Sequence, residues 1–187
     1  MSKTAILNIL KGTALLGLLL LAPAFAKAQS ADSKAITDLL KEAKSHSVIA
    51  EDDAATLESY ALSKISWQTH ANRLTKMKIH ANDLIRDFSQ LKSMRAEGSP
   101  WQQEAIDRIE PLLKDMADHL GAMIDHFNDN KDKVHMPPYR DYAKANLELM
   151  SRTNRLISDF VDYGDARTTA DNLEKTLELP TVALDKE

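Results

Sequence analysis

Apolar residues recur along most of the chain at alternating spacings of three and four, the pattern of helices that bury one face. The first run predicts a helix over about residues 33–47, with Asp32 as its N-cap. Residues 48–51 are then expected to form a loop, and Asp52 and Asp53 to open a second helix that continues to about residue 95. The predicted apolar face of the first helix is Ile36, Leu39, Leu40 and Ala43. The heptad positions of the second are Trp67, His70, Leu74, Met77, Ala81, Leu84, Phe88 and Leu91.

Residues 99–102 predict the start of a third helix. Ser99 is suited to cap it, Pro100 fits the first turn, and Gln102 completes a capping box. The helix is predicted to reach about residue 130, and Pro111 should kink it or split off its first turns. Its apolar stripe is Ile106, Ile109, Leu113, Met116, Leu120, Met123 and Phe127.

A fourth helix is predicted from about residue 139 toward residue 179, after a loop that Pro137 and Pro138 close. Gly164 is a weak point within it, and Pro180 stops it. Its expected stripe is Tyr142, Asn146, Leu149, Thr153, Leu156, Phe160 and Tyr163.

These elements predict an all-α fold, an elongated antiparallel bundle of three to four helices with coiled-coil-like packing. The predicted lengths conflict, because the second helix would span roughly 66 Å and the third roughly 45 Å. Either the molecule is a rod with a two-helix extension, or the second helix breaks near residues 63–66. The rod is the favoured interpretation, and its protruding ends would favour self-association or binding of another protein.

The first 28 residues have the composition of a cleaved secretory signal peptide. Lys3 and Lys11 supply a basic start, residues 14–22 form a short apolar core, and Pro23 precedes a small-residue site. The uncharged stretch is shorter than a membrane span, so no stable membrane anchor is expected after cleavage between Ala28 and Gln29. The predicted organisation is a signal peptide over 1–28, a helical domain over 29–179 and a flexible tail over 180–187. The expected location is the bacterial periplasm or the exterior.

Composition excludes several kinds of chemistry and partner. Removing the three leader lysines from the 24 basic residues leaves 21 against 28 acidic residues, a formal −7, which argues against binding to nucleic acid. The chain contains no cysteine, which excludes disulfides, thiolate nucleophiles and covalent c-type haem. It also lacks a G-x-S-x-G motif, a Glu-x-x-His motif and a glycine-rich phosphate loop, so no enzyme activity and no cofactor are predicted.

Three segments resemble those of a group of uncharacterised exported bacterial helical proteins. They are Ser66 to His70 (SWQTH), Pro100 to Ile109 (PWQQEAIDRI) and Asp162-Tyr163-Gly164. The similarity covers most of the chain after the leader. It implies a small all-helical exported protein and carries no catalytic or ligand residue.

One constellation suggests a metal. A methionine stands three residues before His80, His119 and His126, so a thioether and an imidazole lie one helical turn apart in each case. Antiparallel pairing about residue 98 brings His70 level with His126, and the same construction at the 131–138 loop brings Tyr142 and Ala143 near His126. Imidazole with thioether suits copper, although both residue types are ordinary in a bundle core. The candidate metal residues are His70, His119, His126, Met77, Met116 and Met123.

The sequence therefore predicts an exported, non-catalytic bundle with a structural or protein-interaction role. A copper- or haem-binding bundle that uses the histidine and methionine layers is the alternative. Trp67 is expected in the core because it lies on the heptad seam. Trp101 either staples the start of the third helix or faces a partner.

Overall fold

The computed structural model describes residues 31–178, and the regular structure in that range is entirely helical. The long helices are α1 (Lys34–Ala61), α2 (Trp67–Ser93), α3 (Pro100–Asp129) and α4 (Pro137–Thr176). Short 3-10 turns, η1 (Arg95–Glu97) and η2 (Lys131–Lys133), lie before and after α3. The signal peptide predicted over 1–28 and the tail predicted over 180–187 lie outside the described residues.

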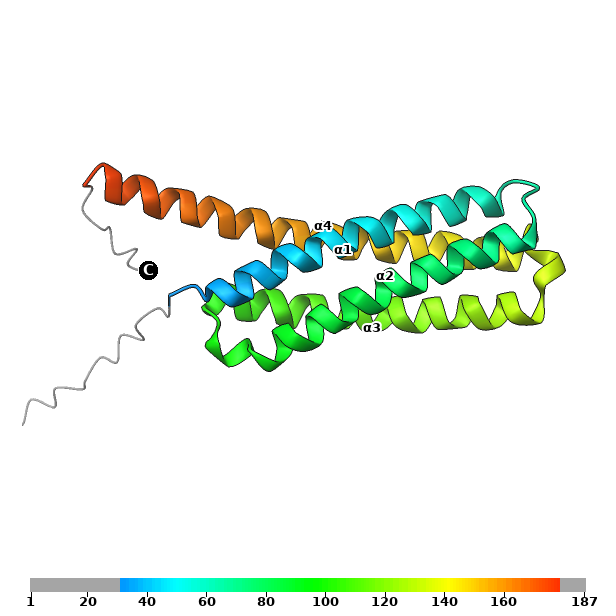
Figure 1. Cartoon of the computed structure of the whole chain (residues 1–187), viewed down its shortest axis with the longest axis horizontal. Coiled ribbons are helices and arrows are strands. Elements are labelled where there is room, and N and C mark those ends of the chain that lie inside the picture. The colour runs from blue at the N-terminus through cyan, green and yellow to red at the C-terminus, as the bar shows by residue number, and fades with distance from the viewer. Residues whose placement is uncertain (1–30, 179–187) are drawn as a thin grey trace, which may run out of the picture.

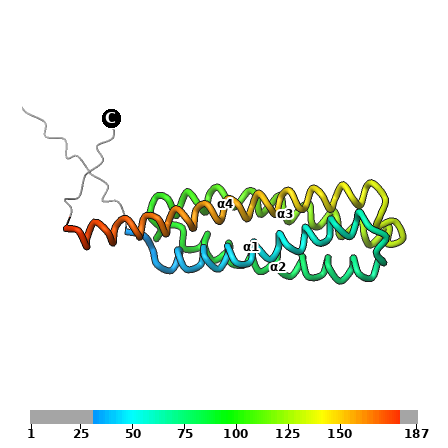
Figure 2. The backbone as a smooth tube through the Cα atoms, turned by 90° about the horizontal axis from the view of Figure 1, so that it is seen from above, coloured from blue at the N-terminus to red at the C-terminus, as the bar shows by residue number. Residues whose placement is uncertain are grey.

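The four helices form an elongated antiparallel bundle, which confirms the predicted all-α fold (Figure 1). α1 and α2 make one layer and α3 and α4 the other (Figure 2). α1 packs closely against both α2 and α4, whereas α2 and α3 make the least contact of the neighbouring pairs. The last turns of α4 extend past the other helices (Figure 1). Within residues 31–178, none of the helices has an apolar stretch long enough to cross a lipid bilayer.

The predicted boundary between the first two helices was wrong. α1 continues without a break through residues 48–53, and the chain turns at 62–66 instead. There Ser66 caps α2, its hydroxyl accepting a hydrogen bond from the Thr69 backbone N–H at 3.4 Å. The break near 63–66, the less favoured interpretation, is the observed one, and the rod with a two-helix extension is not formed. α1, α2 and α3 then have 28, 27 and 30 residues and run side by side.

The bundle core follows the predicted stripes in three helices and departs from them in the fourth. All seven predicted core residues of α3 are buried. All but Trp67 are buried in α2; Trp67 is 41% exposed, so its predicted core position was wrong. In α4 only Asn146 and Thr153 of the predicted stripe are buried. The buried face of α4 is rotated relative to the prediction and consists of Tyr139, Ala143, Asn146, Met150, Thr153, Ile157, Val161 and Gly164.

The start of α1 is fastened to α3 by a buried glutamine. Gln102 Oε1 accepts from the Ser99 and Ser33 backbone N–H groups at 3.0 and 2.9 Å. Gln102 Nε2 donates to the Ser33 carbonyl and the Thr37 hydroxyl. The predicted capping box between Ser99 and Gln102 is therefore present. Ser33, rather than the predicted Asp32, occupies the N-cap position of α1.

Trp101 joins α3 to α4 and to the chain before α1. Its indole N–H donates to Asp32 Oδ1 at 2.8 Å, and its ring meets Tyr163 edge-on at 5.5 Å. It also lies against Gly164, where a Cβ atom would come within 2.7 Å of the indole. Gly164 therefore permits close helix approach and does not interrupt α4. α3 likewise runs unbroken through Pro111, so the predicted splitting of its first turns was wrong.

Candidate functional site

The predicted metal residues occupy unlike environments. His70 is fully buried, and its Nδ1 shares a hydrogen bond of 3.1 Å with the Tyr139 hydroxyl. Tyr60 and Tyr139 each meet its ring edge-on. Burial lowers the pKa of His70, with a smaller contribution from the charge of His135, so the ring is neutral at neutral pH. His70 Nε2 has no partner among the described groups.

The other predicted residues are divided between surface and core. His119 is exposed, whereas His126 is half-buried and its ring lies 5.3 Å from that of Tyr142, as the predicted level alignment required. Met77, Met116 and Met123 are fully buried. Met123 Sδ accepts a hydrogen bond from Asn146 Nδ2 at 3.5 Å. Copper or haem binding by these residues stays a prediction.

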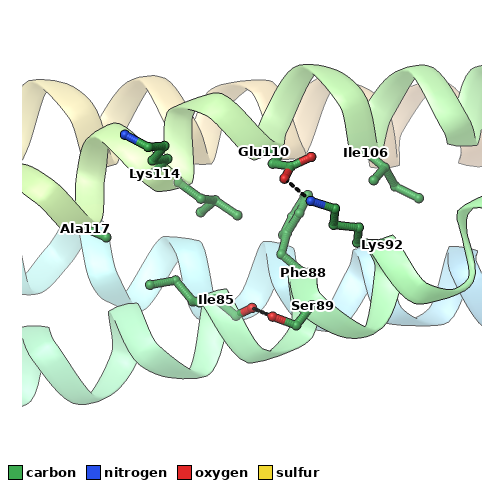
Figure 3. Close-up of a pocket in the computed structure, with 9 residues that line it drawn as sticks. Ile85, Phe88, Ser89, Lys92, Ile106, Glu110, Lys114 and Ala117 are labelled. Atoms are coloured by element: carbon green, nitrogen blue, oxygen red, sulfur yellow. Dashed lines mark hydrogen bonds and ion pairs between the residues drawn. The ribbon is translucent and has the colours of Figure 1, made fainter.

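A groove follows the loosely packed seam between α2 and α3. One hollow of about 260 Å³ is lined mainly by apolar groups, including Ile85 and Phe88 of α2 and Ile106 of α3 (Figure 3). Charged side chains stand at its rim, where Lys92 forms an ion pair with Glu110 (Figure 3). Lys114 completes the rim and pairs with Asp118 at 2.9 Å.

A second hollow of about 300 Å³ lies farther along the same seam. Its walls include Leu74 of α2 and Ile124 and Phe127 of α3. Lys78 and Lys131 stand beside it, and the Lys131 ammonium lies 5.7 Å from the ring centre of Trp67. The exposed Trp67 is thus part of a surface hollow and not of the core.

Along α3, Gly121 lies between the residues that line the first hollow and those that line the second. Gly121 lies one helical turn beyond Ala117 on α3, and a Cβ atom added to Gly121 would meet nothing within 4 Å. Four lysines and one glutamate are the charged residues that line the two hollows. Lys92 and Lys114 form ion pairs with carboxylates, so the excess positive charge of the seam lies at Lys78 and Lys131 beside the second hollow.

The interface between α1 and α2 contains two buried carboxylates, each bonded to a histidine of the other helix. Asp87 of α2 accepts from His46 Nδ1 at 2.5 Å. Asp53 of α1 lies 2.6 Å from His80 Nδ1 and also accepts from Arg73 Nη1 at 2.5 Å. Asp53 and Asp87 are 3% and 1% exposed, so these partners supply hydrogen bonds that water cannot.

At Asp87 a third potential ligand comes close. Ligand atoms of Glu42, His46 and Asp87 all lie within 4.8 Å of one another. Glu42, His46 and Asp87 are not among the predicted metal residues, because none of them belongs to a methionine–histidine pair. A usable signal was present, since a histidine precedes an aspartate by seven residues in both α1 and α2.

Comparison of the chain with protein-family models, with curated proteins and with solved structures finds no match. The resemblance to exported bacterial helical proteins therefore stays a prediction.

Proposed function

We propose that this protein is an exported, non-catalytic helical bundle that binds a protein partner in the groove between α2 and α3. The partner segment is an amphipathic helix whose apolar face is flanked by carboxylates. The observation that carries the proposal is the pair of apolar hollows on a single seam with lysines beside both. Export is supported by the leader-like composition of residues 1–28.

The shape of the groove favours a helix as the occupant. Two antiparallel helices that separate along their seam leave a channel in which a third helix can lie with its apolar face inward. The two hollows are centred about 15 residues apart along α2, or about 23 Å. The partner helix should therefore carry two apolar clusters separated by about four turns.

The charges beside the groove favour an acidic partner. Lys78 forms no ion pair within the described residues, and Lys131 is held over Trp67 rather than by a carboxylate. Carboxylates on the partner would bind these ammonium groups at the edge of the apolar contact. Such rim charges contribute to orientation and association rate more than to affinity.

The test uses a designed helical peptide with two apolar clusters and glutamate flanks, and a matched peptide with lysine flanks. The acidic peptide should bind the chain that begins at Gln29, and the basic peptide should bind it more weakly. Ala117→Leu should block binding because Ala117 lines the first hollow, whereas Ala122→Leu, on an exposed part of α3, should not. Equal binding of both peptides, or retained binding by Ala117→Leu, would contradict the proposal.

Charge-reversal variants test the role of the lysines beside the groove separately from that of the apolar hollows. Lys78→Glu should weaken binding of the acidic peptide and reduce its salt dependence. Lys76→Glu is the matched control, because Lys76 is exposed on the same helix and does not line the groove. Export is tested by determining the N-terminus of the protein recovered outside the cytoplasm, which should be Gln29.

A further inference from the structure

The two buried histidine–aspartate pairs have the same local arrangement. His46 and Asp53 are seven residues apart on α1, and His80 and Asp87 are seven apart on α2. Because the helices are antiparallel, each histidine reaches the aspartate of the other helix, at 2.5 and 2.6 Å. The pairs are thus related by a local two-fold axis between the helices, and each serves as an internal reference for the other.

The two pairs differ in the charges around them. Asp53 has the guanidinium of Arg73 in direct contact at 2.5 Å in addition to His80. At Asp87 the nearest guanidinium, that of Arg86, is 3.6 Å away, and Arg86 contacts Asp83 at 2.7 Å. Glu42 adds a second carboxylate on that side. The His80–Asp53 pair therefore has one carboxylate with the close guanidinium of Arg73. The His46–Asp87 pair instead has two carboxylates near the His46 imidazole, those of Asp87 and Glu42.

From this difference we infer that Glu42, His46 and Asp87 bind a divalent transition-metal ion, for which Zn²⁺ is the best-suited candidate. One imidazole nitrogen and two carboxylate oxygens form a donor set that Zn²⁺ accepts, with water completing the coordination shell. The ion supplies at Asp87 the positive charge that Arg73 supplies at Asp53. It also links α1 to α2, because Glu42 and His46 belong to one helix and Asp87 to the other.

The exposure of Glu42 and His46 allows an ion to reach the three side chains from solvent. Asp87 is 1% exposed, the His46 side chain is 23% exposed, and Glu42 is exposed. Ligands of one zinc ion lie about 3.4 Å apart at metal–ligand distances of about 2.1 Å. The present 2.5 Å contact between His46 and Asp87 must therefore open slightly, and Glu42 must approach. Both movements involve side chains that reach solvent.

The experiment is calorimetric titration of the chain from Gln29 with Zn²⁺. We expect one saturable Zn²⁺ site per chain and a shift in the His46 ring signals by nuclear magnetic resonance. Glu42→Gln and His46→Gln should each weaken binding by about tenfold or more, the scale set by disrupted metal sites. Glu42→Gln should retain the helical circular dichroism of the parent because Glu42 is exposed.

His80→Gln is the matched control, since it alters the related pair that has Arg73 in place of Glu42. It should leave Zn²⁺ affinity unchanged. The inference is overturned if no single saturable site is found, or if Glu42→Gln binds as the parent does. It is also overturned if His80→Gln weakens binding as much as His46→Gln, or if only His119 or His126 variants lose binding. Since peptide binding uses the other face of α2, either proposal can fail while the other stands.

Discussion

The two sides of α2 differ in how closely they are packed. Toward α1, alanines and leucines are fully buried and two carboxylates are bonded to histidines across the interface. Toward α3, the helices make little contact and leave two apolar hollows beside lysines. The same helix thus contributes a closed interface and an open one. Apolar periodicity alone does not distinguish them, because both faces contain residues that could be buried.

Adjacent residues of α2 give the strongest contrast between these sides. Leu84 is fully buried, whereas Ile85 is partly buried and lines the groove. Leu84→Ala should lower the free energy of unfolding by about 3 kcal/mol because it leaves a cavity in the core. Ile85→Ala should cost less than about 1 kcal/mol, since water already reaches that side chain. Denaturant unfolding measures both values, and similar losses would show that the groove is closed in solution.

The next largest loss of stability is expected on removal of a buried carboxylate from the interface between α1 and α2. Asp53→Ala removes the partner of Arg73 and His80 and should destabilise the fold by about 2 kcal/mol, less than a fully buried pair because both partners regain water. The neighbouring Asp52 is exposed, so Asp52→Ala should change stability by no more than about 0.5 kcal/mol. Equal unfolding midpoints for the two variants would refute a stabilising role for the Asp53 pair.

Two mid-helix glycines compare the α2–α3 groove with a tight local contact between α3 and α4, that of Trp101 with Gly164. Gly164→Ala should destabilise the fold by about 1 kcal/mol, because the new Cβ meets the Trp101 ring, which Asp32 and Tyr163 hold in place. Gly121→Ala should stabilise it by about 0.5–1 kcal/mol, since alanine favours helix and the site is open. Thermal melting of both variants provides the test. A destabilised Gly121→Ala would indicate that something occupies the seam there.

The smallest expected effect is a pH dependence of stability that comes from His70 on the buried side of α2. The pKa of His70 is lower in the folded protein than its ordinary value of 6.5, so the unfolded chain takes up the proton more readily. Stability is therefore unaffected by His70 well above pH 6.5 and falls as the pH drops below it, until the folded-state pKa is reached. The expected loss between pH 7.5 and 6 is less than about 1 kcal/mol.

His70→Gln isolates this contribution, because it removes the titrating ring and keeps a group that can bond to Tyr139. The difference in stability between parent and variant should shrink as the pH falls. A difference that does not change with pH would show that His70 does not titrate between the folded and unfolded states.

Much of the fold could be predicted because local pattern and burial agree. The α3 stripe, the Pro100 start and the glutamine at position 102 identified that helix within about one residue at each end. The predicted neighbours of His126 also followed from antiparallel pairing, and Tyr142 is found beside it. These features depend on residues close in sequence or on a helical repeat, which a single sequence contains.

The errors arose where a distant residue determines the outcome. Asp52 and Asp53 resemble a helix start, yet α1 passes through them because Arg73 and His80 of α2 compensate the charge of the buried Asp53. Trp67 has the heptad position of a core residue, yet it lies beside the open seam where Lys131 covers part of its ring. Neither partner is recognisable from spacing along the chain.

The sequence by itself determined that the described chain is helical, which residues face inward in the first turns of α1, in α2 apart from Trp67 and along the stripe of α3, and about where α3 and α4 begin. Helix periodicity and capping depend on residues that are close together in the chain, so a single sequence is enough to predict them. Only the tertiary structure decided where the first turn lies, that apolar hollows lie between α2 and α3, and that Glu42 and His46 meet Asp87. Those outcomes depend on which helix covers each face and on how buried charges find partners across the bundle.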